Sequence, residues 1–446
     1  MRLASSQRAH KDVADTLHVY GWTPEGFVLA GTLNLEESGE NDVRAQFAYA
    51  DPWREHVHAY PLDPINMASY RARYATQSAH VTLGAIFDAA PDAWGRRVVR
   101  ANVPASEQHA VYRNAFLRGA DGIGALVLTP NRPTDIDHIV ALSLSERPKL
   151  SQIQSAARAA RELESDGLVS DALRSMLAGS WTIGGARPKA IVSDDRAQAP
   201  AGRSVIAKFA SARQSVETNR VEYAVLEMAS AMGMRVPQHE LLEIEGEAVL
   251  LLERFDRTDD GARRHYLSAM SLVSAQPVSR MLDSAHDAAV FSWSNLLDVA
   301  SRVCAKPASA RVEMFARLSL NAALSNTDDH LKNFGMLKIA ESALHYEIAP
   351  VFDVTPQASD AHYLHLLDEG RRYTLRDVMA RSRELGIAAS AARDVDERIR
   401  SVLARRHEFF DLAGLSARDV AMVGAWIDRG IGLPSSAPAP ARRPRG

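Results

Sequence analysis

The most constraining feature of this sequence is a polar run, NTDDHLKN at residues 326–333, that directly follows a long amphipathic segment. Carboxylates, amides and a lysine in so short a run are costly to remove from water, so they are poorly suited to filling a core. A further acid, Asp353, lies in an apolar stretch downstream. The fold must therefore present the run in a turn, where its polar groups face solvent or a polar ligand.

Four side chains in and after this run are the groups that phosphoryl transfer requires. Asp328 would accept or orient the proton of an acceptor hydroxyl, and Lys332 would stabilise charge on the transferring group. Asn333 and Asp353 would hold Mg²⁺, a cation that prefers oxygen ligands. The pattern predicts an ATP- and Mg²⁺-dependent kinase.

The same acids allow other interpretations. An EF-hand loop fails because Leu331 stands where that loop needs glycine. A metal-dependent phosphohydrolase is the alternative enzyme class, with His286, Asp287 and His330 joining Asp353 as ligands. We expect Asp329 and His330 to shape the loop, and His330 also to line the nucleotide site.

Composition sets the broad class of the protein. At 446 residues the chain exceeds what one core usually supports, so two or three domains are expected. A net charge of -3 provides no overall attraction to nucleic acid or membrane. The N-terminus lacks the apolar region of a signal peptide, and no apolar run approaches the ~20 residues of a membrane span. We expect a cytoplasmic protein with no membrane contact, in which the single cysteine, Cys304, is a plain buried thiol.

The periodicity of the chain predicts an α+β protein with a two-lobed, protein-kinase-like fold. A β-rich subdomain comes first, because strand-like runs occur at 17–22, 27–35 and 43–49. Later segments show helical spacing, at 150–178, 218–232, 309–325, 375–385, 391–410 and 415–429. The expected boundaries are 1–15 for a flexible arm, 16–145 for the N-terminal subdomain, 146–257 for the ATP-binding N-lobe, 258–433 for the helical catalytic C-lobe and 434–446 for a disordered tail.

Several segments of the first half have a structural and a functional interpretation. Trp94 either forms a docking surface or fills a junction between subdomains. The glycines at 119–124 lack the spacing of a dinucleotide-binding loop and predict a turn. Residues 131–150 contain Pro, Asp and Ser and are interpreted as a linker.

The segment TIGGARPKAIV at 182–192 is the strongest candidate for contact with phosphates. Adjacent glycines, Gly184 and Gly185, let backbone N–H groups approach phosphate oxygens, and Arg187 and Lys189 supply positive charge. A tight hairpin turn with incidental cations explains the same residues equally well. A Walker loop is excluded, because no Gly-Lys pair is present and no helix follows.

Lys208 lies within a β-prone apolar run, VIAKF at 205–209, where a lysine must reach an edge or meet an anion. Protein kinases place their phosphate-binding lysine in this way. Glu222, on the following helix, is expected to pair with it, and Glu217 competes for that role. The segment ERFDR at 253–257 ends an apolar strand and suits the hinge that binds adenine.

These segments together resemble the HipA-like serine/threonine kinases of bacterial type II toxin–antitoxin modules. The resemblance extends over nearly the whole chain, including PDAWG at 91–95 in the N-terminal part. It implies that Asp328 is the catalytic acid/base with Lys332 beside it, and that Asn333 and Asp353 bind Mg²⁺. The implied ATP-binding residues are Lys208, Gly184, Gly185, Lys189, Glu253, Phe255 and His330, with Glu253 and Phe255 acting through their main chain.

The resemblance also implies regulation and partners. Thr182 stands where the family has a serine that is autophosphorylated, which switches the kinase off. The acidic Glu-Asp pair of the family is absent from the matching stretch, 265–270. A HipB-like DNA-binding antitoxin would neutralise the protein, which would contact DNA only through that antitoxin. The protein substrate would be a cellular target, such as an aminoacyl-tRNA synthetase, whose phosphorylation arrests growth and leads to persistence. Two alternatives are a catalytically weak co-repressor and a small-molecule kinase.

Overall fold

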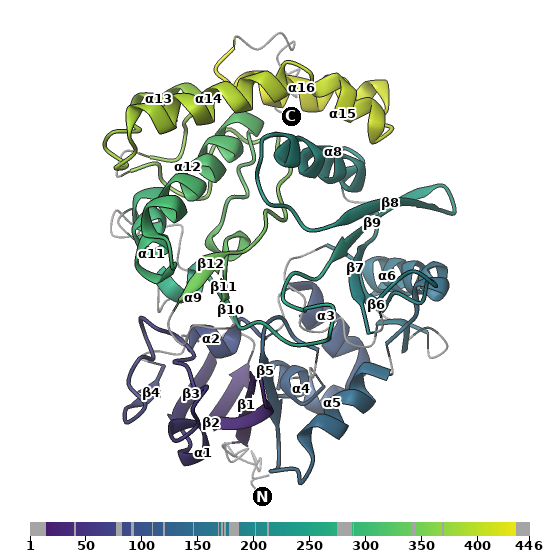
Figure 1. Ribbon diagram of the computed structural model, residues 1–446. Helices are drawn as coiled ribbons and strands as arrows, with labels where there is room; N and C mark the ends of the chain where they lie inside the picture. Colours follow the sequence, from purple (N-terminus) through teal and green to yellow (C-terminus); the bar gives the residue numbers. More distant parts are fainter. Residues whose placement is uncertain are drawn as a thin grey trace, which may run out of the picture.

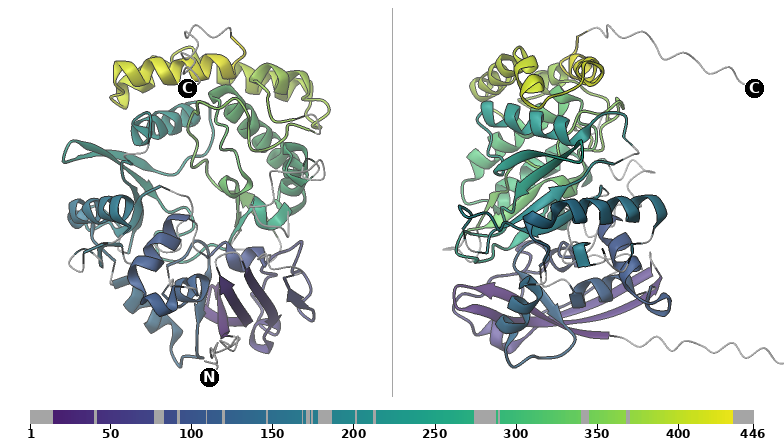
Figure 2. Two further views of the ribbon diagram at one scale, coloured as in Figure 1. Left: turned by 180° about the vertical axis from the view of Figure 1, so that it is seen from behind. Right: turned by 90° about the vertical axis from the view of Figure 1, so that its right-hand side faces the viewer.

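The computed structural model describes residues 15–39, 42–76, 83–90, 93–108, 110–118, 121–145, 147–167, 169–170, 173, 175–177, 187–200, 202–211, 214–273, 288, 290–339, 345–367 and 370–433. The expected tail, and the expected arm apart from Asp15, lie outside these ranges. The fold is α+β: the N-terminal subdomain, the N-lobe and the C-lobe follow one another around the molecule in Figure 1, and the helices of the C-terminus lie farthest from the N-terminal sheet in both views of Figure 2.

The N-terminal subdomain is built on a five-stranded antiparallel sheet of order β4-β3-β2-β1-β5. Its strands are β1 (Asp15–Thr23), β2 (Gly26–Gly39), β3 (Asp42–Tyr49), β4 (Arg73–Ala75) and β5 (Leu126–Thr129). Its helices are α1 (Asp51–Arg54), α2 (Gly84–Phe87), α3 (Ala93–Asn102), the 3-10 helix η1 (Ala105–Glu107), α4 (Val111–Arg118) and α5 (Ile136–Ser145). The first three predicted strands are confirmed.

The interpretation of 131–150 as a linker is wrong, because α5 occupies half of it. Ile136 and Val140, one helical turn apart, are buried against Tyr20, Leu29 and Val127 of the sheet. Residues four apart lie on the same face of a helix, so this pair forms an apolar face that covers the sheet.

The N-lobe contains a four-stranded antiparallel sheet of order β6-β7-β9-β8. One of its helices precedes the first strand of this sheet in the sequence, and another connects β7 to β8. Its elements are η2 (Leu150–Gln152), α6 (Ile153–Asp166), η3 (Ser175–Leu177), β6 (Lys189–Ser193), β7 (Ser204–Lys208), α8 (Thr218–Ala231), β8 (His239–Ile244) and β9 (Glu247–Glu253). Helix α6 ends well before the predicted residue 178, since Gly167 takes a left-handed φ of 70° at its C-cap. Helix α8 agrees with the predicted span 218–232, and Gly233, with φ 79°, follows its C-cap, Met232.

Trp94 joins the N-terminal subdomain to the N-lobe. Its ring is fully buried, and its indole Nε1 donates a hydrogen bond to the carbonyl oxygen of Lys189, the first residue of β6, at 2.9 Å. The interpretation of Trp94 as a docking surface is therefore wrong, and the side chain fills a junction.

The C-lobe combines helices with a three-stranded sheet of order β10-β11-β12. Its elements are β10 (Tyr266–Ser268), α9 (Ala269–Val273), α11 (Trp293–Val303), α12 (Pro307–Leu324), η6 (Leu331–Asn333), β11 (Gly335–Lys338), β12 (Tyr346–Ile348), α13 (Leu375–Ala380), α14 (Ala389–Leu403), α15 (Arg406–Leu412) and α16 (Ala417–Gly430). Three predicted helix spans are wrong: α12 begins at Pro307 rather than after Ser309, α13 ends at Ala380 rather than at residue 385, and 391–410 divides into two helices. Within the ranges given above, no helix is both long and apolar enough to cross a membrane.

Cys304 follows α11 and is a buried free thiol, as predicted. Burial raises the pKa of its thiol to about 12, so the group stays protonated at neutral pH. Because the thiolate is the reactive form, Cys304 is not a nucleophile under ordinary conditions.

Helix α16 holds the end of α12, from which the polar run begins. The Ser325 hydroxyl donates to the carbonyl oxygen of Trp426 at 2.7 Å. Gly430 lies so close to α12 that a Cβ added there would come within 2.4 Å of the Ala323 carbonyl oxygen. This glycine is required for the two helices to approach.

We expect Gly430→Ala to lower the free energy of unfolding by about 1–3 kcal/mol, because the added methyl group overpacks the junction. Gly424→Ala on the same helix is the matched control, since a Cβ there meets nothing within 4 Å. The control should be neutral or stabilising by at most ~1 kcal/mol, as alanine favours helix. Urea denaturation measures both, and equal effects of the two changes would contradict the assigned contact.

Candidate active site

A cleft opens where the N-lobe, the C-lobe and the N-terminal subdomain meet. The side chains that line it come from all three parts: Asp88, Ala90, Ile123, Lys189, Ile206, Lys208, Pro237, Leu252, Glu253, Phe255, Tyr266, Ser268, His330, Lys332, Asn333, Phe352 and Asp353. Its walls thus combine aromatic and aliphatic groups with lysines and acids, as in sites for ligands that have an apolar and an anionic part.

Lys208 ends strand β7 and bonds to two carboxylates. Its Nζ lies 2.7 Å from Glu222 Oε1 and 2.9 Å from Asp353 Oδ1. Burial alone would lower the pKa of Lys208, but Asp353 and Glu222 outweigh it and raise that pKa, so the side chain is an ammonium. The predicted pairing with Glu222 is confirmed, whereas Glu217 pairs with Arg220 at 2.6 Å instead.

Helix α8 is tied to the strand that carries Lys208. The Asn219 amide Nδ2 donates to the carbonyl oxygens of Lys208 at 2.9 Å and Ala248 at 2.8 Å. Arg187 adds a second cation, with Nη1 at 3.3 Å from Glu222 Oε2 and Nη2 at 3.0 Å from Thr355 Oγ1. Local sequence therefore places Glu222 on the helix, and the two hydrogen bonds of Asn219 within the N-lobe hold that helix against the strands beside Lys208.

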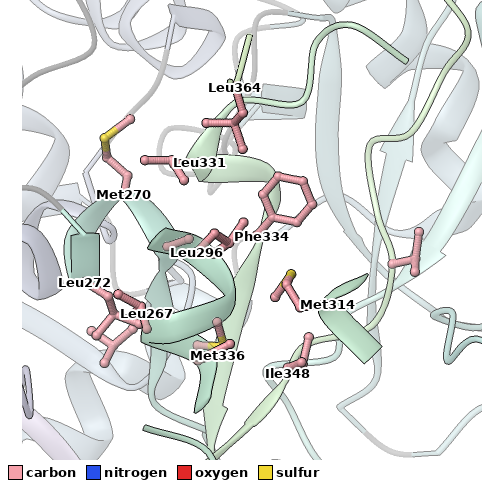
Figure 3. Close-up of a cluster of buried hydrophobic side chains, with 14 of the residues drawn as sticks. Leu267, Met270, Leu272, Leu296, Met314, Leu331, Phe334, Met336, Ile348 and Leu364 are labelled. Atoms are coloured by element: carbon pink, nitrogen blue, oxygen red, sulfur yellow. The ribbon is translucent and has the colours of Figure 1, made fainter. Parts of the chain in front are cut away.

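Apolar anchors hold the polar run in place. Leu331 and Phe334 flank Lys332 and Asn333 and point into a buried cluster with Leu296, shown in Figure 3. This burial leaves the two polar residues between them on the opposite side, where they line the cleft.

Asp329 shapes the loop, as predicted, by accepting hydrogen bonds in a fully buried position. The Trp293 Nε1 and the Tyr373 hydroxyl donate to its Oδ2 at 3.1 and 3.0 Å. The backbone N–H of Tyr363 donates to Oδ1 at 2.6 Å. The ring of His362 stacks on that of Tyr373 with centroids 4.0 Å apart, which gives His362 a structural role beside Asp329.

We expect Asp329→Asn to lower the free energy of unfolding by about 2–3 kcal/mol. The new asparagine would place an amide nitrogen, itself a donor, against hydrogen-bond donors that the Asp329 carboxylate now accepts from. Asp360→Asn is the control: Asp360 is exposed and forms an ion pair with the exposed Arg372 at 3.1 Å. Surface changes of this kind stay within ~0.5 kcal/mol. Chemical denaturation of both variants measures the difference, and a neutral Asp329→Asn would contradict the assigned role.

Asp328, the neighbour of Asp329, has the opposite environment. Its side chain is 54% exposed and lies 3.8 Å from His330 Nε2. Partial loss of hydration beside the cleft raises the pKa of Asp328; the His330 charge opposes this and the Asp353 charge adds to it. An exposed carboxylate with a raised pKa is suited to exchange protons with a ligand.

Asp353 and Asn333 offer oxygen atoms to the cleft. Asp353 has a φ of 55°, a left-handed conformation uncommon outside glycine. Burial alone would raise the pKa of Asp353, but Lys208, Arg187 and Lys189 outweigh it and hold that pKa well below its ordinary value. The Asn333 Nδ2 donates to the carbonyl oxygen of Asp328 at 2.9 Å, which leaves the amide oxygen as the atom able to bind a cation. A carboxylate and an amide oxygen are a donor set that fits Mg²⁺.

The hinge after β9 forms the apolar part of the cleft. The Phe255 ring lies 5.4 Å from that of Phe352 and 6.2 Å from that of Tyr266, measured between centroids. Glu253 and Leu252 line the same wall.

Buried ion pairs attach this hinge to the N-terminal subdomain. Arg254 bonds to Asp121 at 2.7 Å and to Asp256 at 2.7 Å, and the Gly124 N–H donates to Asp256 at 2.6 Å. Burial alone would raise the pKa of Asp256, but Arg254 and Arg257 lower it well below its ordinary value. The hinge is thereby held in one place, as a binding site requires.

Most of the predicted site residues converge on this cleft. Its lining includes Lys189, Lys208, Glu253, Phe255, His330, Lys332, Asn333 and Asp353. Asp328 lies beside the lining rather than in it. Thr182, Gly184 and Gly185 fall outside the residues that the structure describes, and their roles stay predictions.

Sequence reasoning missed the residues that the N-terminal subdomain contributes to the cleft, which are Asp88, Ala90 and Ile123. No local motif marks them, because their role depends on how the subdomain docks. For the metal-dependent phosphohydrolase alternative, the described parts of the chain contain no group of three or more His, Cys, Asp or Glu placed to hold a metal. His286 and Asp287, which that alternative needs, are themselves outside the described residues.

Comparison with known proteins agrees with this architecture. The family model for the HipA-like C-terminal domain matches residues 181–407. The fold is similar to that of HipA from Shewanella oneidensis MR-1, solved with HipB and its operator DNA, with a TM-score of 0.62 and 16% identity over 94% of this chain and 98% of that chain. CtkA, a proinflammatory kinase of Helicobacter pylori, matches at a TM-score of 0.40 and 16% identity over 55% of this chain and 88% of that chain. No curated protein matches by sequence.

The structural match to HipA over nearly the full length of both chains confirms the predicted two-lobed, kinase-like α+β fold. The family match begins before β6 and continues through the polar run into α15. It therefore contains Lys208, Asp328 and Asp353, the residues on which the resemblance was based. This chain belongs to the HipA-like C-terminal domain family.

Proposed function

We propose that this protein is an ATP- and Mg²⁺-dependent serine/threonine protein kinase and the toxin of a toxin–antitoxin pair. One observation supports this most: Lys208 bonds to both Glu222 and Asp353 at the wall of the cleft described above. Kinases use such a lysine–glutamate pair and a metal-binding aspartate to position ATP. Membership of the HipA family supports the same conclusion.

Adenine would occupy the apolar part of the cleft. Ile206, Leu252 and Phe352 present aliphatic and aromatic surfaces there. The main chain of Glu253 and Phe255, at the end of β9, offers hydrogen bonds to the edge of the base. Because the hinge is attached to the N-terminal subdomain, these groups would be in place before the nucleotide binds.

The phosphates would lie toward the charged part. Lys189 and Lys208 supply positive charge, with His330 on the facing wall. The Asp353 carboxylate and the Asn333 amide oxygen would hold Mg²⁺, which neutralises charge on the β- and γ-phosphates when bound. Asp328 would take the proton of the acceptor hydroxyl, and Lys332 would stabilise the charge that develops on the phosphoryl group.

We further propose a HipB-like antitoxin as partner, since HipA of Shewanella oneidensis was solved in a complex with HipB and operator DNA. DNA would be contacted only through that partner. The substrate would be a serine or threonine of a cellular protein, such as an aminoacyl-tRNA synthetase, and Thr182 would be an autophosphorylation site. Growth arrest would follow from modification of the target.

The test is transfer of label from γ-labelled ATP by the purified protein, alone and in cell extract, beside Asp328→Ala. Label on this chain or on another protein band, absent with the variant, supports the proposal. Label only on small molecules indicates a small-molecule kinase instead. No turnover together with retained antitoxin binding indicates a co-repressor.

The pH dependence of the reaction gives a further prediction. Activity is expected to fall as the pH is lowered through the raised pKa of Asp328, because a general base acts only when ionised. The measurement is kcat/KM against pH, with melting temperature recorded over the same range to exclude unfolding. Activity that stays constant down to the ordinary aspartate pKa of about 3.9 would contradict this role.

A further inference from the structure

Arg187 connects the N-lobe to the C-lobe beside Lys208. It precedes β6 in the sequence, and its Nη2 donates a hydrogen bond to Thr355 Oγ1 of the C-lobe at 3.0 Å. Its Nη1 lies 3.3 Å from Glu222 Oε2, whereas Lys208 bonds to the other carboxylate oxygen, Oε1, at 2.7 Å. The buried Glu222 is thus held between two cations, and one of these cations is itself bonded to the C-lobe.

The segment 355–359 holds the buried Thr355 in place. The Gln357 Nε2 donates to Thr355 Oγ1 at 3.1 Å, and the Gln357 N–H donates to the carbonyl oxygen of Ser325 at 3.0 Å. Arg429 of α16 donates to the last three carbonyl oxygens of this segment, at 2.7, 2.8 and 2.7 Å. Because side chain and main chain are both bonded, the Thr355 hydroxyl is an acceptor in a fixed position.

Two polar contacts of this region cross from the N-lobe to the chain after β12. One joins Lys208 to Asp353 at 2.9 Å, and the other joins Arg187 to Thr355. The first uses an acid that the proposed function assigns to Mg²⁺. The second uses a neutral hydroxyl with no such role, so it can persist when nucleotide and metal occupy the cleft.

We propose that Thr355 is a positioning residue that, through Arg187, holds Glu222 beside Lys208 and keeps the two lobes closed on a bound nucleotide. The inference deepens the proposed kinase function and rests on it for the identity of the ligand. Loss of the Thr355 hydroxyl leaves Arg187 paired with Glu222 but frees this pair from the C-lobe. The lobes then separate more readily, and the nucleotide leaves faster.

The test is the dissociation rate of a fluorescent, non-hydrolysable ATP analogue bound with Mg²⁺, measured by stopped flow. Thr355→Val removes the hydroxyl and keeps a β-branched side chain of similar size. We expect it to raise the dissociation rate about tenfold, an effect within the range of one hydrogen bond to a charged group, with the association rate changed by less than about twofold. A wild-type dissociation rate in this variant overturns the proposal.

Two further variants separate positioning from a merely structural role. Thr355→Ser keeps the hydroxyl and should return the dissociation rate to within about twofold of wild type. Thr129→Val is the matched control, since Thr129 is also a buried threonine whose hydroxyl donates a hydrogen bond, to the carbonyl oxygen of Asn131 at 2.7 Å in the N-terminal subdomain. It should leave the rate unchanged. Faster dissociation from both valine variants, or no rescue by serine, overturns the specific role of the Thr355 hydroxyl.

The dependence on Arg187 is tested in the same assay. If Thr355 acts through Arg187, then Thr355→Val should add nothing to the dissociation rate of Arg187→Met. A further tenfold increase in the double variant would show that the hydroxyl acts by another route and overturns the proposal.

A measurement without nucleotide distinguishes failure of this inference from failure of the proposed function. Melting temperatures of wild type, Thr355→Val, Arg187→Met and the double variant form a double-mutant cycle. A non-additive shift supports the contact between the lobes even if the protein binds no nucleotide, in which case the kinase proposal alone fails. Additive shifts overturn the contact whatever the activity.

Discussion

Replacing Asp328 with alanine is expected to reduce phosphoryl transfer by about 10²–10⁴-fold, the usual contribution of a general base. The fold should be unaffected, because the side chain is largely exposed and its nearest charged partner, His330, lies 3.8 Å away. The raised pKa of Asp328 means that the ionised form does not stabilise the native state at neutral pH. The melting temperature of the variant should therefore equal or exceed that of wild type.

Asp411→Ala is the control for this change, since Asp411 is an exposed aspartate on α15 of the same lobe. It should leave both activity and melting temperature at wild-type values. Expression in growing cells gives a second measurement: Asp328→Ala should no longer arrest growth. Arrest by this variant would show that toxicity does not depend on phosphoryl transfer.

The change with the largest expected effect on stability and phosphoryl transfer together is Lys208→Met, which removes the ammonium group but keeps a side chain of similar length. Glu222 and Asp353 would lose the cation that bonds to both, and breaking a buried ion pair costs about 3–5 kcal/mol. Arg187 still pairs with Glu222, so the lower end of that range is expected. Loss of a preorganised donor to the phosphates should reduce transfer by a further ~10²–10³-fold.

Lys338→Met is the matched control, because Lys338 lies outside the cleft with its Nζ 4.7 Å from the centroid of the Tyr60 ring. Urea denaturation and titration with an ATP analogue measure stability and binding separately for the two variants. Normal analogue binding by folded Lys208→Met would show that the nucleotide does not lie against β7.

Local patterns accounted for several elements of the fold. The short apolar runs of strand length predicted β1 to β3, and the helical spacing over 218–232 predicted α8, because both patterns depend on neighbours within a few positions. Helix α5 was missed since its short apolar face is meaningful only against the outer side of the N-terminal sheet. The early end of α6 depends on the backbone of a single glycine, Gly167.

In the candidate site, too, some residues could be predicted from the sequence and others depend on tertiary contacts. Lys208, Asn333 and Asp353 could be selected from residue type and order, because a lysine in a strand and acids near a turn are unusual in a core. Asp88, Ala90 and Ile123 could not, since their chain segments reach the cleft only through the docking of the N-terminal subdomain. The attachment of the hinge through Asp121 and Arg254 is likewise a contact between residues more than a hundred positions apart.

Asp328 and Asp329 show most clearly what each level determines. The amino-acid sequence by itself established the chemistry available: two adjacent carboxylates, then an amide and a lysine, after a helix. Only the tertiary structure decided which carboxylate is structural, because Trp293, Tyr363 and Tyr373 enclose Asp329 and donate hydrogen bonds to it. Asp328 is left in contact with water beside the cleft. The reason is physical: hydration and hydrogen bonding set the behaviour of a carboxylate, and here both are supplied by residues distant in the chain.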